Sequence, residues 1–72
     1  MKEYRMSVAE ICGLFGWTPT DLSRQAQINA RTAKSAYDGK EPSARTKRDI
    51  CSAFSREFDR KITPAEVAWD VD

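Results

Sequence analysis

The sequence predicts an all-α fold, a compact bundle of five helices. Apolar residues recur along the chain at the i, i+3, i+4, i+7 spacing of one helical face. Each of these segments is bounded by the cap and stop residues that are typical of helix ends. No segment alternates apolar and polar residues as a half-buried strand does. Because the chain has 72 residues, we expect one domain, residues 1–72, with a thin core.

The first helix is expected over residues 8–15. Ser7 is its expected N-cap, with Glu10 at the spacing of a capping box, and Gly16 is expected to end it. Its apolar face would consist of Val8, Ile11, Cys12 and Phe15. The spacing of these four residues is what predicts a helix that packs on one side only.

The second helix is expected to begin with Thr18 as N-cap and Pro19 as the first helical residue. A break is expected at residues 27–29, where Asn29 would cap a third helix over residues 30–37. Gly39 and Pro42 then separate this third helix from the rest of the chain.

A fourth helix is expected over residues 44–58, with Ser43 as its cap. The cap, proline and acid pattern of the second helix recurs at residues 63–66. This recurrence predicts a short fifth helix that runs through Val67 and Trp69.

Composition excludes several classes of site. The chain has no histidine, which removes the usual metal clusters and histidine-based acid–base catalysis. Cys12 and Cys51 are too few and too far apart for a disulfide framework or a CxxC zinc site, and we expect both to be buried, inert thiols. No glycine-rich phosphate loop is present. We therefore expect no enzyme, no cofactor and no metal.

Localisation is expected to be cytoplasmic. The longest apolar runs fall far short of the ~20 residues of a membrane span, so no membrane partner is expected. The first residues, MKEYRMSVAE, lack the apolar core of a signal peptide.

The distribution of charge is more informative than the net charge of +1. Residues 24–48 hold seven basic and two acidic side chains, a net charge of +5, and the remainder of the chain carries −4. A basic centre between acidic flanks suits one anionic partner on one face. A solvated helix surface would give the same pattern.

The centre of the chain carries a family resemblance. Small side chains would let the second and third helices cross closely; they are Ser23, Ala26, Ala33 and Ala36. Together with Leu22, the segment Gln27-Ile28-Asn29, Gly39 and Pro42, these residues resemble the helix-turn-helix of the phage repressor, Cro and XRE-type regulators. The resemblance implies a lambda-repressor-like fold with its helix-turn-helix at about residues 18–38. It also implies sequence-specific binding of double-stranded DNA and no cofactor. Such proteins are commonly homodimeric transcriptional repressors, and we expect the homodimer to read an inverted-repeat operator.

The resemblance also assigns roles to residues. The helix at 30–37 would read base edges through Ala30, Arg31, Lys34 and Ser35. Arg31 is the best candidate for a bidentate contact to guanine. Phosphates would be held by Thr18, Thr20, Thr32, Lys40 and Arg45. Candidates for a dimer interface are Val67, Trp69 and Val71, although Trp69 would equally fit folding back onto the first helix.

Four positions depart from the family pattern. One of them is Ala33, which is smaller than the aliphatic residue usual at that core position. Gln27 stands where a turn glycine is common, at a possible left-handed backbone position. Ser23 replaces the usual alanine and needs a hydrogen-bond partner, expected in a carbonyl one turn earlier. Pro19 replaces a polar residue that often contacts phosphate, so that contact is lost.

Two alternatives remain open. Residues 11–22 also resemble a helix-turn-helix, with Gly16 at the turn, although Gln25 would then occupy a core position. In this register, base contacts would come from Pro19, Thr20, Ser23, Arg24 and Gln27. The second alternative is a protein-interaction adaptor or antitoxin-like module that uses the same fold with weak or no DNA binding.

Overall fold

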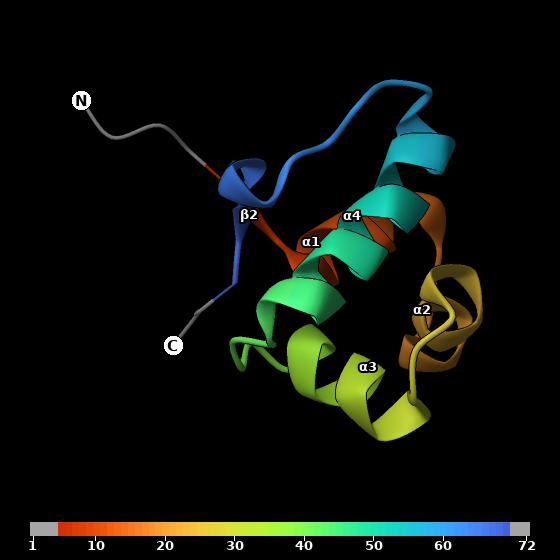
Figure 1. The fold of residues 1–72 in the computed structure, drawn as a ribbon. Coiled ribbons are helices and arrows are strands. Elements are labelled where there is room, and N and C mark those ends of the chain that lie inside the picture. Colours follow the sequence, from red (N-terminus) through yellow and green to blue (C-terminus); the bar gives the residue numbers. More distant parts are fainter. Residues whose placement is uncertain (1–4, 70–72) are drawn as a thin grey trace.

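The computed structural model describes residues 5–69. Within this range, four α-helices follow one another: α1 (Val8–Phe15), α2 (Pro19–Ala26), α3 (Ala30–Tyr37) and α4 (Ala44–Phe58). A 3₁₀ turn, η1 (Pro64–Glu66), and two short strands, β1 (Met6–Ser7) and β2 (Val67–Ala68), complete the described chain. In Figure 1, α4 crosses the middle of the molecule and α2 and α3 pack at one end of it. The predominantly helical class and the predicted bounds of these four helices are confirmed.

The predicted caps explain why helices of only eight residues have defined ends. The Ser7 hydroxyl accepts from the Glu10 N–H at 3.2 Å, and the Ser7 N–H donates to Glu10 Oε1 at 2.9 Å. Thr18 and Asp21 form the same reciprocal pair at 3.2 and 2.9 Å. At the other end of α1, Gly16 takes the left-handed conformation with φ 73°. Each cap satisfies backbone groups that a short helix would otherwise leave unpaired.

The predicted fifth helix is wrong. The capping pair Thr63 and Glu66 closes one 3₁₀ turn, after which the chain becomes extended. Val67 and Ala68 then pair in parallel with Met6 and Ser7 of β1. The physical reason lies in the apolar spacing, because Val67 and Trp69 are two residues apart, which is the period of a strand. The expectation that the chain forms no strand is wrong for the same reason.

The hydrophobic core joins all four helices to the β2 segment. Its buried residues are Val8, Ile11, Cys12, Leu22, Ala26, Ala33, Ala36, Ile50, Cys51, Ala53, Phe54, Ile62, Val67 and Trp69. The ring of Phe15 extends one end of this core, with its centroid 4.9 Å from the rings of both Trp17 and Phe58. No helix in residues 5–69 is long and apolar enough to cross a membrane.

Two of the three expected dimer residues belong to this core. Val67 is 1% exposed and Trp69 8% exposed, so neither side chain forms a surface patch. The Trp69 indole N–H donates to the Pro64 carbonyl at 2.8 Å, and Lys47 Nζ lies 5.8 Å from the centroid of the ring. The assignment of these two residues to a dimer interface is therefore wrong. The third candidate, Val71, lies outside the described residues.

Candidate nucleic-acid interface

The turn between α2 and α3 is fixed by Ser23 and Ile28. The Ile28 N–H donates to the Ser23 carbonyl at 3.0 Å, and the Ser23 hydroxyl donates to the Ile28 carbonyl at 2.7 Å. The expected partner of Ser23, one turn earlier, is therefore wrong, because the hydroxyl points forward into the turn. Gln27 between them has φ 56° and ψ 47°, so this position is left-handed as expected. This conformation costs a residue with a side chain about 1 kcal/mol.

Small buried side chains bring α2 and α3 together. Ala26 of α2 and both Ala33 and Ala36 of α3 are buried, and Leu22 is fully buried beside them. Asn29 defines the start of α3, because its Oδ1 accepts from the Arg31 N–H at 2.7 Å. In Figure 1, α2 is seen almost end-on while α3 runs across the view, so the two axes are steeply inclined. The opposite face of α3 is thereby held toward solvent.

That outer face carries the residues expected to read bases. Ala30, Arg31 and Lys34 are exposed and Ser35 is half-buried. Within the described chain, the Arg31 guanidinium has no hydrogen bond or ion pair. Lys34 Nζ instead lies 3.3 Å from Asp38 Oδ2, in a pair of largely exposed side chains. The structure therefore brings the four residues onto one helix and leaves Arg31 as the unpaired cation among them.

The start of α2 provides fewer free N–H donors for binding a phosphate than the sequence suggested. The Thr18 N–H and the Asp21 N–H both donate inside the capping box, and Pro19 has no N–H. The Asp21 carboxylate also places a negative charge at this helix end. Thr20 remains exposed, but Thr18 is committed to the cap. A phosphate would have to displace Asp21 to use the Thr18 N–H.

The three other expected phosphate contacts lie along and beyond α3. Thr32 is half-buried, whereas Lys40 and Arg45 are exposed. Gly39, with φ 95°, turns the chain after α3, and the Lys40 N–H donates back to the Ser35 carbonyl at 3.0 Å. Lys40 is thus tied by its backbone to the end of α3 while its side chain remains in solvent.

The basic centre of the sequence is divided between surfaces. Lys47 Nζ lies 2.6 Å from Glu41 Oε2 and also faces the Trp69 ring. Arg48 lies instead in a groove between α4 and the chain that follows it. Farther along α4, Arg56 Nη2 donates to the Gln25 carbonyl of α2 at 2.6 Å. Charge counted along the chain therefore overstates the charge that α3 presents.

The thiols of Cys12 and Cys51 are buried and have low reactivity. Burial raises the pKa of Cys12 to about 11, with a smaller contribution from the Asp21 carboxylate. Burial also raises the pKa of Cys51 to about 11, again with a smaller contribution, from Glu66. Both thiols are consequently protonated near neutral pH, whereas the thiolate is the form that acts as a nucleophile or metal ligand. In residues 5–69 no cluster of three histidine, cysteine, aspartate or glutamate side chains could hold a metal ion.

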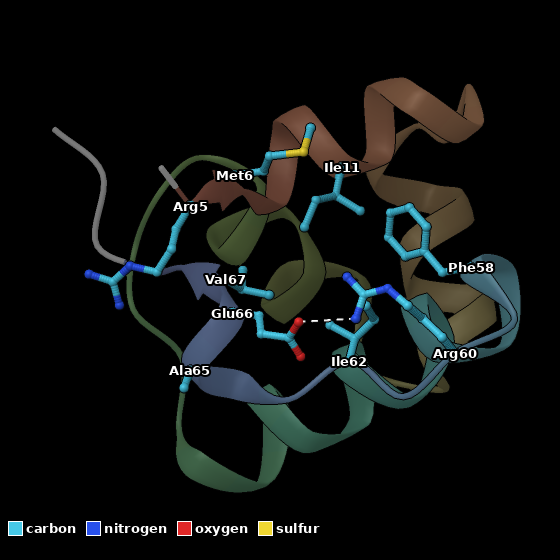
Figure 2. Close-up of a pocket in the computed structure, with 9 residues that line it drawn as sticks. All are labelled: Arg5, Met6, Ile11, Phe58, Arg60, Ile62, Ala65, Glu66 and Val67. Atoms are coloured by element: carbon cyan, nitrogen blue, oxygen red, sulfur yellow. Dashed lines mark hydrogen bonds and ion pairs between the residues drawn. The ribbon is translucent and has the colours of Figure 1, made fainter. Parts of the chain in front are cut away.

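A groove of about 600 Å³ opens beside β1 and η1, as Figure 2 shows. Apolar side chains line it, among them Ile11, Phe58, Ile62 and Val67. Arg60 Nη1 and Glu66 Oε1 pair at 3.1 Å across it, and Arg5 points away. Hydrogen bonds from the Thr63 backbone and from Arg60 lower the pKa of Glu66. Of the charged residues that line this groove, Arg60 and Glu66 are therefore paired with each other, and Arg5 is not part of that pair.

The alternative register places base contacts on α2, where the geometry is less suitable. Its residue Ser23 is half-buried and is hydrogen-bonded inside the turn. Arg24 and Gln27 are exposed, but Gln27 already lies in the left-handed turn beyond the helix.

Comparisons of the chain with models of protein families, with curated proteins and with solved structures found no match.

Proposed function

We propose that the protein binds double-stranded DNA sequence-specifically by placing α3 in the major groove. The observation that carries this proposal is the unpaired, exposed guanidinium of Arg31 on a short helix whose opposite face is packed. An α-helix fits the width of the major groove. The pairs Ser23–Ile28 and Asn29–Arg31 restrict the orientation of this helix, which favours the alignment that base recognition requires.

Arg31 is the proposed base reader. Its fork of N–H donors matches O6 and N7 of guanine, and one such bidentate contact contributes ~1–3 kcal/mol of discrimination against other bases. Lys34 can exchange Asp38 for a base edge or a phosphate, because an exposed i, i+4 ion pair contributes only ~0.3–0.5 kcal/mol. Ala30 and Ser35 would lie beside these two cations, with a methyl group and a hydroxyl.

Phosphate contacts are proposed for Lys40, Arg45 and Thr20, which are all exposed. Each phosphate that a cation neutralises releases condensed counterions, so binding should weaken steeply as salt rises. Thr18 has a smaller part in this proposal than the sequence alone suggested, because its N–H and hydroxyl form the capping box with Asp21.

The biological role that follows from such binding is transcriptional repression or a related form of regulation, on the nucleoid in the cytoplasm. A homodimer on an inverted repeat would place its two copies of α3 about one helical turn, ~34 Å, apart on the duplex. Such a dimer would need a surface other than Val67 and Trp69. Among the described residues, Leu14 is the large hydrophobic side chain left exposed, at 61%.

The test is selection of duplexes from a random DNA library, followed by sequencing. An enriched inverted repeat would support the homodimeric regulator, and an enriched single half-site would support a monomeric reader. If no sequence is enriched even at low salt, the proposal is overturned.

Arg31→Ala and Arg24→Ala then provide a matched pair on the selected duplex, because each removes one exposed arginine. We expect R31A to weaken binding about 10- to 100-fold and to relax specificity at one base pair, while R24A changes affinity by less than about threefold. The reverse order would assign recognition to α2.

A further inference from the structure

A second groove lies between α4 and the chain that connects it to η1. Its volume is about 510 Å³. It is lined by Arg48, Cys51, Ser52, Ser55 and Arg56 of α4 and by Lys61, Ile62, Thr63 and Pro64 of the connection. Figure 1 shows α4 lying between this connection and α3. The groove is therefore separate from the surface proposed to bind DNA.

Ser55 holds the two walls of the groove together. Its hydroxyl accepts from the Ile62 N–H at 2.7 Å and donates to the Cys51 carbonyl at 2.7 Å. Ile62 is buried and Cys51 is almost fully buried, so their side chains give the groove an apolar base. The shape of the groove is therefore defined by the buried residues Cys51 and Ile62 on its two walls and by the Ser55 hydroxyl that connects them.

The rim of the groove is cationic. Arg48, Arg56 and Lys61 all line it, and none of the described residues that line it is acidic. Arg56 is held by its hydrogen bond to the Gln25 carbonyl, whereas Arg48 and Lys61 are exposed and make no ion pair within residues 5–69. The neighbouring Glu66 carboxylate is occupied by Thr63 and Arg60. A ligand that enters the groove therefore meets, above an apolar base, cations that have no acidic partner within the described part of the chain.

This combination discriminates between classes of anionic ligand. Proteins that bind single-stranded nucleic acid use aromatic side chains on which bases stack, and within residues 5–69 no aromatic side chain lines this groove. A duplex is read by elements that protrude into its grooves, whereas this site is a hollow. Carboxylates form charge-assisted hydrogen bonds with arginine and lysine, and an aliphatic side chain suits the apolar base.

We propose that this groove binds an acidic peptide segment of a partner protein. One aliphatic side chain of the segment lies on Cys51 and Ile62, and flanking carboxylates pair with Arg48 and Lys61. No residue that lines the groove belongs to α3, so the two proposals can be tested separately. Failure of the DNA-binding proposal would leave this one unaffected, and the reverse also holds.

The test measures binding of a short fluorescent peptide in which glutamates flank a central leucine. A second peptide carries glutamine in place of that leucine, at the same charge. The groove variant is Arg48→Glu with Lys61→Glu, and the matched control is Arg31→Glu with Lys34→Glu, which makes the same change of charge on α3. Fluorescence anisotropy at physiological ionic strength gives each affinity.

We expect the groove variant to bind the leucine peptide at least about tenfold more weakly, since two charge-assisted contacts are lost, and the control to change by less than about threefold. The glutamine peptide should bind the unaltered protein several-fold more weakly than the leucine peptide. Equal losses in both variants, or equal affinity for both peptides, would mean diffuse charge attraction and overturn the proposal. Loss of duplex binding in the groove variant, with peptide binding retained, would overturn it in favour of nucleic acid.

A second variant and a direct map keep the test independent of folding defects. Ser52 is exposed on the same wall, so Ser52→Glu adds a carboxylate to the groove without removing a core contact. This variant should also weaken binding of the leucine peptide. In backbone amide NMR spectra, the peptide should shift Ser52, Ile62 and Thr63 and leave Arg31 unchanged. Shifts confined to α3 would contradict the assignment.

Discussion

Ser23 and Ile28 are hydrogen-bonded to each other twice, once through the Ser23 hydroxyl at 2.7 Å and once through the Ser23 carbonyl at 3.0 Å. Both bonds span the turn between α2 and α3, so they set the direction in which α3 leaves α2. The residue at the centre of this turn, Gln27, has an unfavourable left-handed backbone. The side chain of Ser23 thus helps to hold a turn geometry that a glycine at position 27 would adopt without steric cost.

Ser23→Ala should destabilise the protein and loosen α3. The half-buried Ile28 carbonyl would lose the Ser23 hydroxyl as a donor, at a cost of about 1–2 kcal/mol in the free energy of unfolding. Denaturation in urea, followed by circular dichroism, measures this change. Ser52→Ala on exposed α4 surface is the control and should have little effect. Equal stability of S23A and the unaltered protein would show that the turn does not depend on this hydroxyl.

Gln27→Gly should raise stability by about 0.5–1 kcal/mol, because glycine adopts a positive φ without the steric cost of a side chain. Asp59, which ends α4 with the same φ of 56°, provides an independent comparison through Asp59→Gly. Thermal unfolding of both variants measures the effect. If D59G is stabilised and Q27G is destabilised, the Gln27 side chain makes a favourable contribution to the turn that exceeds its backbone cost.

Local signals in the sequence were sufficient to predict the four α-helices. Ser7, Thr18, Asn29 and Ser43 all cap the helices that they were expected to cap. Cap residues act on backbone groups two or three positions away, so their effect can be read from adjacent residues. The left-handed position of Gln27 was expected on different grounds, from the resemblance, because a turn glycine is common at that place in the family pattern.

Long-range contacts explain what the sequence could not predict. Val67 is part of a strand because it pairs with Met6. The two residues are far apart in the chain, so the sequence gives no local signal of this pairing. The groove cations were equally hidden, since Arg48 and Arg56 meet Lys61 only when the connection folds back along α4. The two-residue spacing of Val67 and Trp69 was a usable signal for the strand. The eight-residue spacing of Arg48 and Arg56 placed both on one helical face, but nothing local indicated what would face them.

The buried thiols should make stability fall in alkaline solution. The pKa of Cys12 and of Cys51 is raised from the ordinary value of 9.0 to about 11 in the folded protein. A raised pKa means that the folded state holds the proton more tightly, so this contribution is fully present below pH 9.0 and is lost as pH rises toward about 11. Urea denaturation across that range should show a decline that is shallower in the double variant Cys12→Ala with Cys51→Ala. Equal slopes would assign the decline to other groups.

Asp38→Asn should strengthen binding of the selected duplex. Asp38 is the carboxylate that pairs with Lys34, and it carries negative charge at the end of the helix proposed to enter the major groove. Its removal frees Lys34 and also removes repulsion from nearby phosphates, so we expect affinity to rise about 3- to 10-fold at low salt. The slope of log affinity against log salt should become steeper if Lys34 gains a phosphate contact.

Glu57→Gln, an exposed acid near the far end of α4, is the matched control for D38N. It changes net charge equally and should affect affinity by less than about twofold if charge acts locally at α3. Equal gains in the two variants would mean that overall charge, and not the face of α3, controls binding. If D38N shows no gain in affinity, then Lys34 does not contact DNA even when its ion pair with Asp38 is removed. Arg31 alone would then carry recognition from this helix.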